Sequence, residues 1–471
     1  MKILVTGSTG YIGSNLVPAL VARGYQVRLL VRDASRVNPS FSNLSLEYVQ
    51  GTLEDTNALR EALRDVTVAY YLVHSMQKGA DFHQTDIRLA GKFAELARES
   101  NVGRVVYLGA LGNPDSKLTE HLKSRHETGE ILASTGVNVL EFRSGPVIGS
   151  GSMPFEMIRY LTERLPVMIC PKWIKTNVQP IGLKDILLYL VSSASIKKTG
   201  HCIIEVGGSD ILSYGEMMTK YARIRKLHRF MIHVPVLTPR LSSKWVHLVT
   251  PLKSNFARPL VEGLKNEIVV RNNEAHRLFP DVSPRSYAES VQFAVKMLHP
   301  SAMNNVTANV VKGYKKDTQG MIIEHRVTTI DASIDAVYRA FTSLGGANGW
   351  YFNFAWQVRG ALDRLIGGPG LRRKNGASPI KEKQNLDFWH VESLREPNRM
   401  LLKADMKLPG SAWIEFRAEK DERSERTKFS QITYFAPHGL MGYLYWWTLL
   451  PIHRFIFDRL ITKVAKASQA H

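Results

Sequence analysis

A short apolar run at the start of the chain leads directly into three glycines spaced three residues apart. Residues 2–6 (KILVT) have the composition of a strand, Gly7, Gly10 and Gly13 follow, and apolar residues then recur at helical spacing. The first glycine permits a tight turn, the second lets the backbone approach an anion, and the third lets the helix pack closely on the strand. The helix N-terminus would direct unpaired N–H groups and a positive dipole end at that anion. The stretch therefore predicts a strand, turn and helix that cradle a phosphate.

This context is typical of dinucleotide binding, whereas the alternative is a glycine-rich turn without a ligand. We expect the cofactor to contact the segment that runs from the threonine before the first glycine to the last glycine. Its members are Thr6, Gly7, Ser8, Thr9, Gly10, Tyr11, Ile12 and Gly13.

The end of the second strand indicates which dinucleotide binds. Residues 26–31 (QVRLLV) read as that strand, and Arg32 follows it. About 20 residues after the glycines, an acid usually holds the ribose hydroxyl and an arginine suits a 2′-phosphate. We therefore favour NADP(H) over NAD(H), because a planar guanidinium matches a phosphate. Asp33 keeps NAD(H) open as the alternative, and Arg36 is either a second phosphate ligand or a solvated loop cation.

Strand-like and helical patterns alternate through the first half of the chain, in the order 26–31, 46–49, 56–63, 66–73, 82–99, 104–108, 120–133 and 138–142. Regular alternation with short links predicts an α/β Rossmann fold with a doubly wound parallel sheet. Ligands of such sheets bind beyond the carboxyl ends of the strands. Further candidate site residues are therefore those that directly follow strands, namely Thr52, His74, Ser75, 109–112 and 143–146.

Several of these segments resemble a known family. The glycine motif, the arginine that ends the second strand and residues 51–55 (GTLED) resemble atypical, extended short-chain dehydrogenase/reductases of the NmrA-like type. Residues 143–149 (RSGPVIG) and 177–185 (NVQPIGLKD) are similar to the substrate-side segments of that family. The resemblance covers about the first 300 residues and implies NADP(H) binding with redox chemistry on a carbonyl or hydroxyl group.

The chain departs from the family at its proton-transfer pair, Tyr-x-x-x-Lys. By position, His121 and Arg125 replace that pair, and Gly109 or Ala110 replaces the family's serine. Histidine can exchange a proton near neutral pH, whereas arginine can hold the ribose but does not give up a proton. His121 and Arg125 are thus the candidate catalytic residues, with a surface or structural histidine as the alternative. We expect His74 near the nicotinamide, or else as a packing or capping residue.

A second domain follows the first. Residues 306–320 lose apolar periodicity and predict a linker. We expect the first domain over 1–305, with substrate-side segments from about residue 150, and the second over 321–471.

The second domain begins with a strand at 321–328 and a helix at 333–341. Several antiparallel-type strands follow, and an apolar helical region at 441–466 is expected to break at Pro451. This order resembles the α+β helix-grip fold of START and polyketide-cyclase-like proteins. Residues that include Trp350, Trp356 and Trp389 resemble a bacterial domain of unknown function fused to such reductases. The resemblance implies an apolar cavity for a hydrophobic ligand, and the tryptophans either line it or form core.

The net charge of +20 makes nucleic acid, an anionic membrane surface and anionic substrates candidate partners. The basic residues are dispersed, however, and we see no nucleic-acid-binding motif, so we expect no nucleic acid.

Two cysteines are too few for a disulfide framework and fit a reducing cytosol, and we expect no metal. A strand at residue 2 argues against a signal peptide. We therefore expect a cytoplasmic protein. Peripheral membrane contact of the aromatic stretch 440–450 is the alternative to packing.

Together these observations predict an NADP(H)-binding oxidoreductase that acts on a bulky apolar carbonyl or quinone-like compound. The second domain would hold or deliver a small hydrophobic substrate or ligand. Because the usual tyrosine and lysine are absent, a non-catalytic NADP(H)-binding sensor or assembly factor is the alternative.

Overall fold

The chain divides into two compact units, Met1–Met297 and Leu298–His471, in a computed structural model. The structure describes residues 1–33, 37–74, 82–234, 249–251, 262–263, 265–303, 314–345, 349–351, 353–365, 367–368, 370, 380–421 and 424–470.

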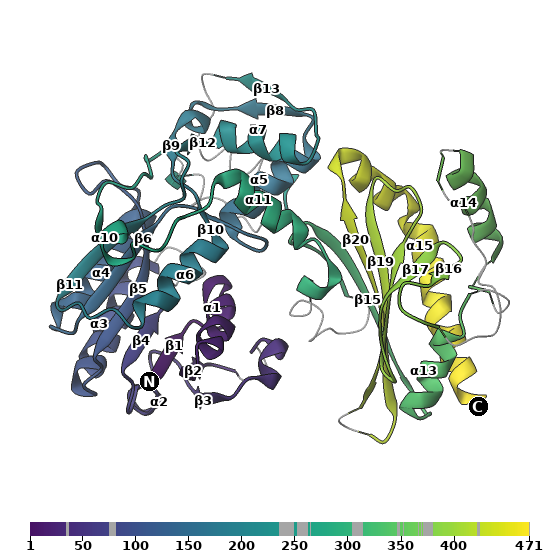
Figure 1. Ribbon diagram of the computed structural model, residues 1–471, viewed down its shortest axis with the longest axis horizontal. Helices are drawn as coiled ribbons and strands as arrows, with labels where there is room; N and C mark the ends of the chain where they lie inside the picture. The colour runs from purple at the N-terminus through teal and green to yellow at the C-terminus, as the bar shows by residue number, and fades with distance from the viewer. Residues whose placement is uncertain are drawn as a thin grey trace. The chain divides into compact units, whose positions relative to one another are not determined.

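A seven-stranded parallel sheet forms the centre of the first unit, in the order β11-β6-β5-β4-β1-β2-β3 (Figure 1). Its strands are β1 (Lys2–Thr6), β2 (Gln26–Val31), β3 (Leu46–Gln50), β4 (Val68–Tyr71), β5 (Arg104–Ala110), β6 (Val139–Ser144) and β11 (His201–Val206). The chain winds outward from β1 to β3 and then returns to the other side of β1. The order therefore reverses between β1 and β4, where Val5 lies opposite Tyr70. The predicted doubly wound parallel sheet is confirmed.

Helices cover both faces of this sheet because the buried strands alternate their apolar side chains between them. Val5 belongs to the cluster beneath α1 (Tyr11–Ala22), α6 (Leu183–Ser193) and α10 (Glu274–Leu278). Leu4 belongs to the opposite cluster, beneath α2 (Thr56–Leu63), α3 (Phe82–Glu99) and α4 (Glu120–Ser134). The position of α4 matters for function because this helix carries both candidate catalytic residues.

A smaller group of elements adjoins the carboxyl side of the sheet. It comprises β7 (Val147–Ile148), α5 (Met153–Arg164), β8 (Val167–Cys170), β9 (Asn177–Val178), β10 (Ile181–Gly182), β12 (Leu212–Ser213), α7 (Tyr214–Ile224), β13 (Phe230–His233) and α11 (Tyr287–Lys296). Phe155, Tyr221 and Tyr287 are fully buried in its own apolar cluster. Within it the buried Glu163 accepts hydrogen bonds from the Tyr221 hydroxyl at 2.8 Å and from Arg225 Nε at 2.6 Å.

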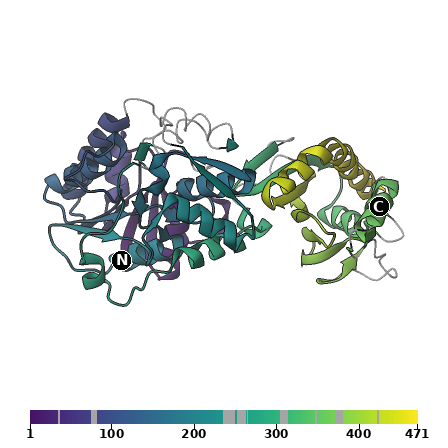
Figure 2. The same cartoon turned by 90° about the horizontal axis from the view of Figure 1, so that it is seen from above.

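The second unit is built on a seven-stranded antiparallel sheet, in the order β14-β15-β20-β19-β18-β17-β16. Its strands are β14 (Tyr314–Thr318), β15 (Met321–Ile330), β16 (Asn385–Leu386), β17 (Trp389–Arg395), β18 (Arg399–Ala404), β19 (Gly410–Lys420) and β20 (Thr427–Pro437). Two further helices accompany α13 (Ile334–Thr342): α14 (Asn353–Leu365) and α15 (Gly439–Gln469), the yellow helix of Figures 1 and 2. Both α13 and α15 pack on the sheet, where Phe341 stacks on Phe416 at 5.8 Å between ring centres.

Two expectations for this region are wrong. Residues 314–318 of the predicted linker form β14, because Gln319 and Gly320 adopt positive φ angles of 52° and 76° and close a two-residue hairpin to β15. Residues 306–313 lie outside the described residues. The predicted break at Pro451 is also absent, since α15 continues through it. Buried Trp446 and Ile456 anchor the helix on both sides of the proline, and this packing outweighs the lost backbone hydrogen bond.

Among the described residues, no helix is both long enough and apolar enough to cross a membrane.

The packing of α4 on β6 depends on a glycine. A Cβ atom on Gly129 would lie 2.2 Å from Glu141 Oε2, a fully buried carboxylate that also contacts Arg143 and His201. We expect Gly129→Ala to lower the free energy of unfolding of the first unit by about 2–4 kcal/mol, through overpacking and disruption of this buried pairing. Differential scanning calorimetry of the full chain measures the change.

Gly91→Ala is the matched control, because Gly91 is also helical but its added Cβ would lie 3.6 Å from Ile131, an ordinary contact. It should be neutral or raise the free energy of unfolding by up to about 1 kcal/mol, from helix propensity. Equal effects of the two substitutions would contradict the packing described here.

Candidate functional site

The turn after β1 brings three backbone segments together without side chains between them. Gly7 has a φ of +72°, and a Cβ there would lie 2.7 Å from the Leu72 carbonyl oxygen beyond β4. A Cβ on Gly13 would lie 2.3 Å from the Gly7 carbonyl oxygen. Gly10 is the N-cap of α1, and a Cβ there would meet only that same oxygen, at 3.2 Å. The outer side of Gly10 is therefore open, directly before the unpaired N–H groups of α1.

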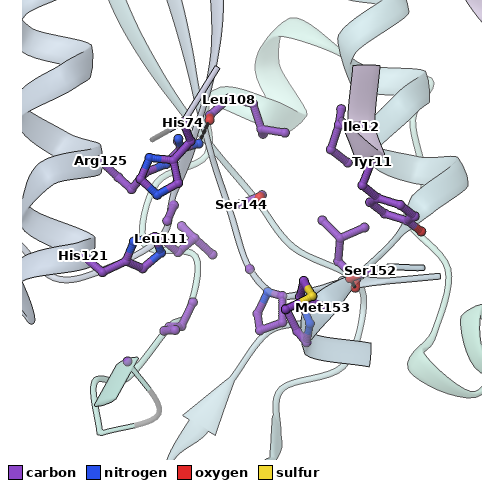
Figure 3. A pocket seen from close by; sticks show the side chains of 18 of the residues that line it. Tyr11, Ile12, His74, Leu108, Leu111, His121, Arg125, Ser144, Ser152 and Met153 are labelled. Atoms are coloured by element: carbon purple, nitrogen blue, oxygen red, sulfur yellow. Dashed lines mark hydrogen bonds between the residues drawn. The ribbon is translucent and has the colours of Figure 1, made fainter. Parts of the chain in front are cut away.

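A cavity of about 430 Å³ extends from this turn along the carboxyl ends of β1, β4, β5 and β6. Its apolar wall includes Leu108, Leu111, Met153 and Met157. Its polar side chains are Tyr11, His74, His121, Arg125, Ser144, Ser152 and Tyr214. Figure 3 shows the two histidines and the arginine on one side of the cavity, opposite Tyr11 and Ile12. The cavity thus lies where a doubly wound sheet binds its ligands.

His74 lies just beyond β4 and is held by α3. Its Nδ1 is 2.6 Å from Oδ2 of Asp86, a carboxylate that is only 4% exposed. Burial lowers the pKa of the His74 imidazole, although the hydrogen bond to Asp86 opposes that shift. Asp86 therefore fixes the orientation of the His74 ring at the edge of the cavity.

His121, in the first turn of α4, faces His74 with 5.2 Å between ring centres. Within the described part of the chain, its buried Nδ1 has no hydrogen-bond partner. Burial, and then the neighbouring His74 and Arg125, lower the pKa of His121 to about 3. The ring is therefore neutral near pH 7, and it can donate one hydrogen bond and accept another.

Arg125 lies one turn further along α4 and is fixed from two sides. Its guanidinium donates to the Leu108 carbonyl oxygen and lies 5.1 Å from the centre of the Tyr107 ring. The Tyr107 hydroxyl in turn donates to the Arg125 carbonyl oxygen at 2.9 Å. The cavity consequently combines a rigid cation with a neutral imidazole.

The structure brings most of the predicted site residues to this one cavity. Those that line it are Gly7, Gly10, Tyr11, Ile12, Gly13, His74, His121 and Arg125. Arg32 lies apart from it, exposed at the end of β2, and it forms no ion pair with a described residue. Arg36 and Ser75 lie outside the described residues.

Thr6, which we expect in the cofactor-binding segment, does not line the cavity. The Thr6 hydroxyl donates to the Tyr70 carbonyl oxygen at 2.9 Å and so joins β1 to β4. Ser8 is buried and Thr9 is exposed, and neither lines the cavity. Within the glycine motif, the side chains of Ser8 and Thr9 thus lie outside the cavity, whereas Tyr11 and Ile12 line it together with the three glycines.

Sequence reasoning missed Asp86. In the sequence it reads as an ordinary helical acid, because most helical carboxylates are solvated. Its position was a usable signal, however. Asp86 lies on the same helical face as Leu89, Ala90 and Phe93, the buried stripe of α3. A carboxylate on a buried stripe needs a partner, and here that partner is His74.

Two segments of the chain match known protein families, one in each unit. Residues 7–136 match a family described as NAD(P)H-binding, and residues 323–460 match a family described only as a protein of unknown function. The first unit therefore contains a Rossmann domain whose residues 7–136 are similar to NAD(P)H-binding domains.

Two curated relatives are similar to part of this chain. Sterol demethylase protein B from Methylococcus capsulatus is 37% identical over 129 residues, which are 26% of this chain and 39% of that protein. A 4-hydroxy-2-methyl-3-oxo-4-farnesyl-3,4-dihydroquinoline-1-oxide ketoreductase from Stigmatella aurantiaca is 32% identical over 111 residues, 23% of this chain and 33% of that protein. This chain therefore spans well under half the length of these relatives.

A solved structure extends the likeness in fold. The NADP(H) complex of Citrobacter sp. triphenylmethane reductase covers 62% of this chain and 100% of its own, with a TM-score of 0.51 and 15% identity. This likeness shows the fold of the first unit.

The low pKa of His121 has a measurable consequence for stability. Because its folded-state pKa of about 3 is below the ordinary value of 6.5, the unfolded chain takes up a proton there that the folded chain does not. His121 thus destabilises the fold increasingly as pH falls from 6.5 towards 3. We expect His121→Gln to lose less stability than the wild type between pH 6.5 and 4, measured by denaturant unfolding at a series of pH values.

His228→Gln is the control for this experiment, because that histidine is exposed on the same unit. Identical pH dependence in the wild type and in His121→Gln would show that His121 is not held neutral by its surroundings.

Proposed function

We propose that the first unit is an NADP(H)-dependent reductase of bulky apolar carbonyl or quinone-like compounds, and that the second unit holds a hydrophobic ligand. The observation that carries the first part is the convergence of the glycine turn, His121 and Arg125 on one apolar cavity. At one end of the cavity, the backbone of the glycine turn would hold the cofactor. At the other end, His121 and Arg125 would donate hydrogen bonds to the oxygen of a substrate that accepts the hydride.

The residues present fit a nicotinamide dinucleotide. The open side of Gly10 and the N-terminus of α1 would receive the pyrophosphate. Arg32, exposed at the end of β2, would pair with a 2′-phosphate, which supports NADP(H). When bound, the reduced cofactor supplies a hydride. Arg125 would contact the ribose or the substrate oxygen from α4.

The described side chains support charge stabilisation at the substrate oxygen. A neutral His121 would donate a hydrogen bond to the carbonyl oxygen as negative charge develops on it, and the fixed Arg125 cation would lower the energy of that charge. Leu111, Met153 and Met157 would exclude water, which strengthens both interactions. The hydrogen bond to Asp86 would hold the His74 ring beside the ring of His121.

Two further observations support the choice of substrate and the role of the second unit. One relative is named as the ketoreductase of a farnesylated dihydroquinoline oxide, a bulky apolar ketone. The antiparallel sheet and long C-terminal helix of the second unit resemble the helix-grip fold of START-like proteins and line an apolar cavity of about 610 Å³.

We further propose that the protein is cytoplasmic. The exposed Leu444 and Trp447 of α15 are the side chains that would contact a membrane.

Arg32 determines cofactor choice in this proposal. We expect Arg32→Ala to weaken NADPH binding by about 10- to 100-fold, because a charge-assisted contact to the 2′-phosphate is lost, while NADH binding stays unchanged. Titration of nicotinamide fluorescence measures both affinities. Arg60→Ala, which removes an exposed arginine from α2, is the control. Equal weakening of both cofactors by Arg32→Ala would exclude a 2′-phosphate contact.

His121 is tested by two substitutions that differ in hydrogen-bond donation. Using NADPH and a panel of bulky aromatic ketones and quinones, we expect His121→Phe to lower kcat by about 10- to 100-fold and His121→Gln, which keeps an N–H donor, to lower it less. Because the acting form is neutral, kcat should stay flat from pH 6 to 8. A kcat that falls as pH rises through 6.5 would instead identify His121 as an imidazolium acid.

The same assay decides between catalysis and sensing. Tight NADPH binding without oxidation by any compound of the panel would favour the non-catalytic sensor or assembly factor. Sustained, substrate-dependent oxidation excludes it.

A further inference from the structure

A second cavity lies within the second unit, between α14, α15 and the sheet, with a volume of about 610 Å³. Its wall is almost entirely apolar and aromatic, with Met406, Leu449 and Phe457 among the lining residues. Phe354 of α14 and Ile452 of α15 also line it, yet they are 68% and 51% exposed, so the cavity reaches the surface between these two helices. A ligand could therefore enter between α14 and α15.

Four buried tryptophans of this unit separate into two groups. Trp350 and Trp413 are buried, and their indole N–H groups donate to the carboxylates of Asp387 at 2.8 Å and Glu392 at 2.9 Å. Trp389 and Trp446 are buried equally deeply, at 4% and 3% exposure.

The indole Nε1 atoms of this second pair have no hydrogen-bond partner among the described residues. Both side chains line the cavity. A buried N–H without an acceptor is unfavourable, and few native structures keep one without a reason. Here the two residues that carry such donors line the same apolar cavity.

Two further polar side chains on the cavity wall are also able to donate a hydrogen bond to an acceptor atom of a ligand. His453 of α15 lies 5.3 Å from Trp446 between ring centres, and its Nδ1 is buried without a partner in the described chain. Arg359 of α14 contributes a cation that contacts the Lys407 carbonyl oxygen at 3.2 Å and Asp363 at 3.9 Å. The Tyr434 hydroxyl, by contrast, is already committed to Glu415 at 2.7 Å. The polar groups that remain on this wall can therefore supply hydrogen bonds to a ligand.

We propose that this cavity binds an apolar molecule through an oxygen acceptor, a carbonyl or a carboxylate, that the indole N–H groups of Trp389 and Trp446 recognise. The inference rests on the ligand-holding role proposed for the second unit and deepens it by naming the recognised group. It requires neither NADPH nor turnover, so it can fail or succeed separately from the reductase proposal.

The experiment is calorimetric titration of the full-length protein, without NADPH, with three 2-substituted naphthalenes of similar size. Acetylnaphthalene carries a carbonyl, naphthoate a carboxylate, and isopropylnaphthalene no acceptor. We expect at least one of the first two to bind about tenfold or more tightly than isopropylnaphthalene, since each donor would gain a partner. The stronger of the two identifies whether a neutral or an anionic oxygen is preferred.

Substitutions then assign the effect to the two indoles. Trp389→Phe and Trp446→Phe keep an aromatic ring but remove the N–H, and we expect each to weaken binding of the preferred acceptor ligand by about fivefold while leaving isopropylnaphthalene unaffected. Trp413→Phe is the matched control, because that ring lines the same cavity but its N–H already bonds to Glu392.

Equal affinities for all three naphthalenes in the wild type, or no binding of any, would overturn the proposal without reliance on a variant. Loss of affinity in Trp413→Phe as large as in the other two would also overturn it, because the ring and not the unpaired N–H would then be responsible.

Discussion

The site depends on the close backbone contact between the turn after β1, the start of α1 and the loop after β4. A Cβ on Gly13 would lie 2.3 Å from the Gly7 carbonyl oxygen, and a Cβ on Gly7 would lie 2.7 Å from the Leu72 carbonyl oxygen. Because no side chain separates these segments, α1 begins directly at the carboxyl edge of the sheet. Its unpaired N–H groups then face the same cavity as His74, which follows Leu72 by two residues.

A second constraint positions the chemistry on the opposite wall. Gly129 lets α4 approach the buried Glu141 of β6, and the Arg125 guanidinium reaches the Leu108 carbonyl oxygen of β5. These contacts fix the helix that carries His121 and Arg125. Burial then keeps His121 uncharged, whereas Arg125 retains a fixed geometry beside it. The two cavities described above share one feature, since apolar walls surround polar hydrogen-bond donors in each.

Features set by local sequence were the ones that could be predicted. The glycine spacing and the alternation of apolar runs predicted the parallel sheet, the turn and the position of His74 at its edge, whereas His121 and Arg125 were placed by the resemblance to a reductase family. Features set by contacts distant in sequence could not be predicted. The bond between His74 and Asp86, the hydroxyl bond of Thr6 to β4 and the continuity of α15 through Pro451 all depend on packing partners that the local pattern does not name.

The central claim is that the glycine turn holds a nicotinamide dinucleotide in the cavity that His121 and Arg125 share. Fluorescence titration of the full chain with NADPH, in the wild type and in Gly10→Val, tests it most directly. Gly10 has an ordinary extended backbone, with φ −80° and ψ 171°, so valine is tight only against the Gly7 carbonyl oxygen, 3.2 Å from its Cβ, and it fills the open side of the turn. The account predicts one bound NADPH per chain in the wild type and none in a folded Gly10→Val. Absence of binding in the wild type, or unchanged binding in the variant, would contradict it.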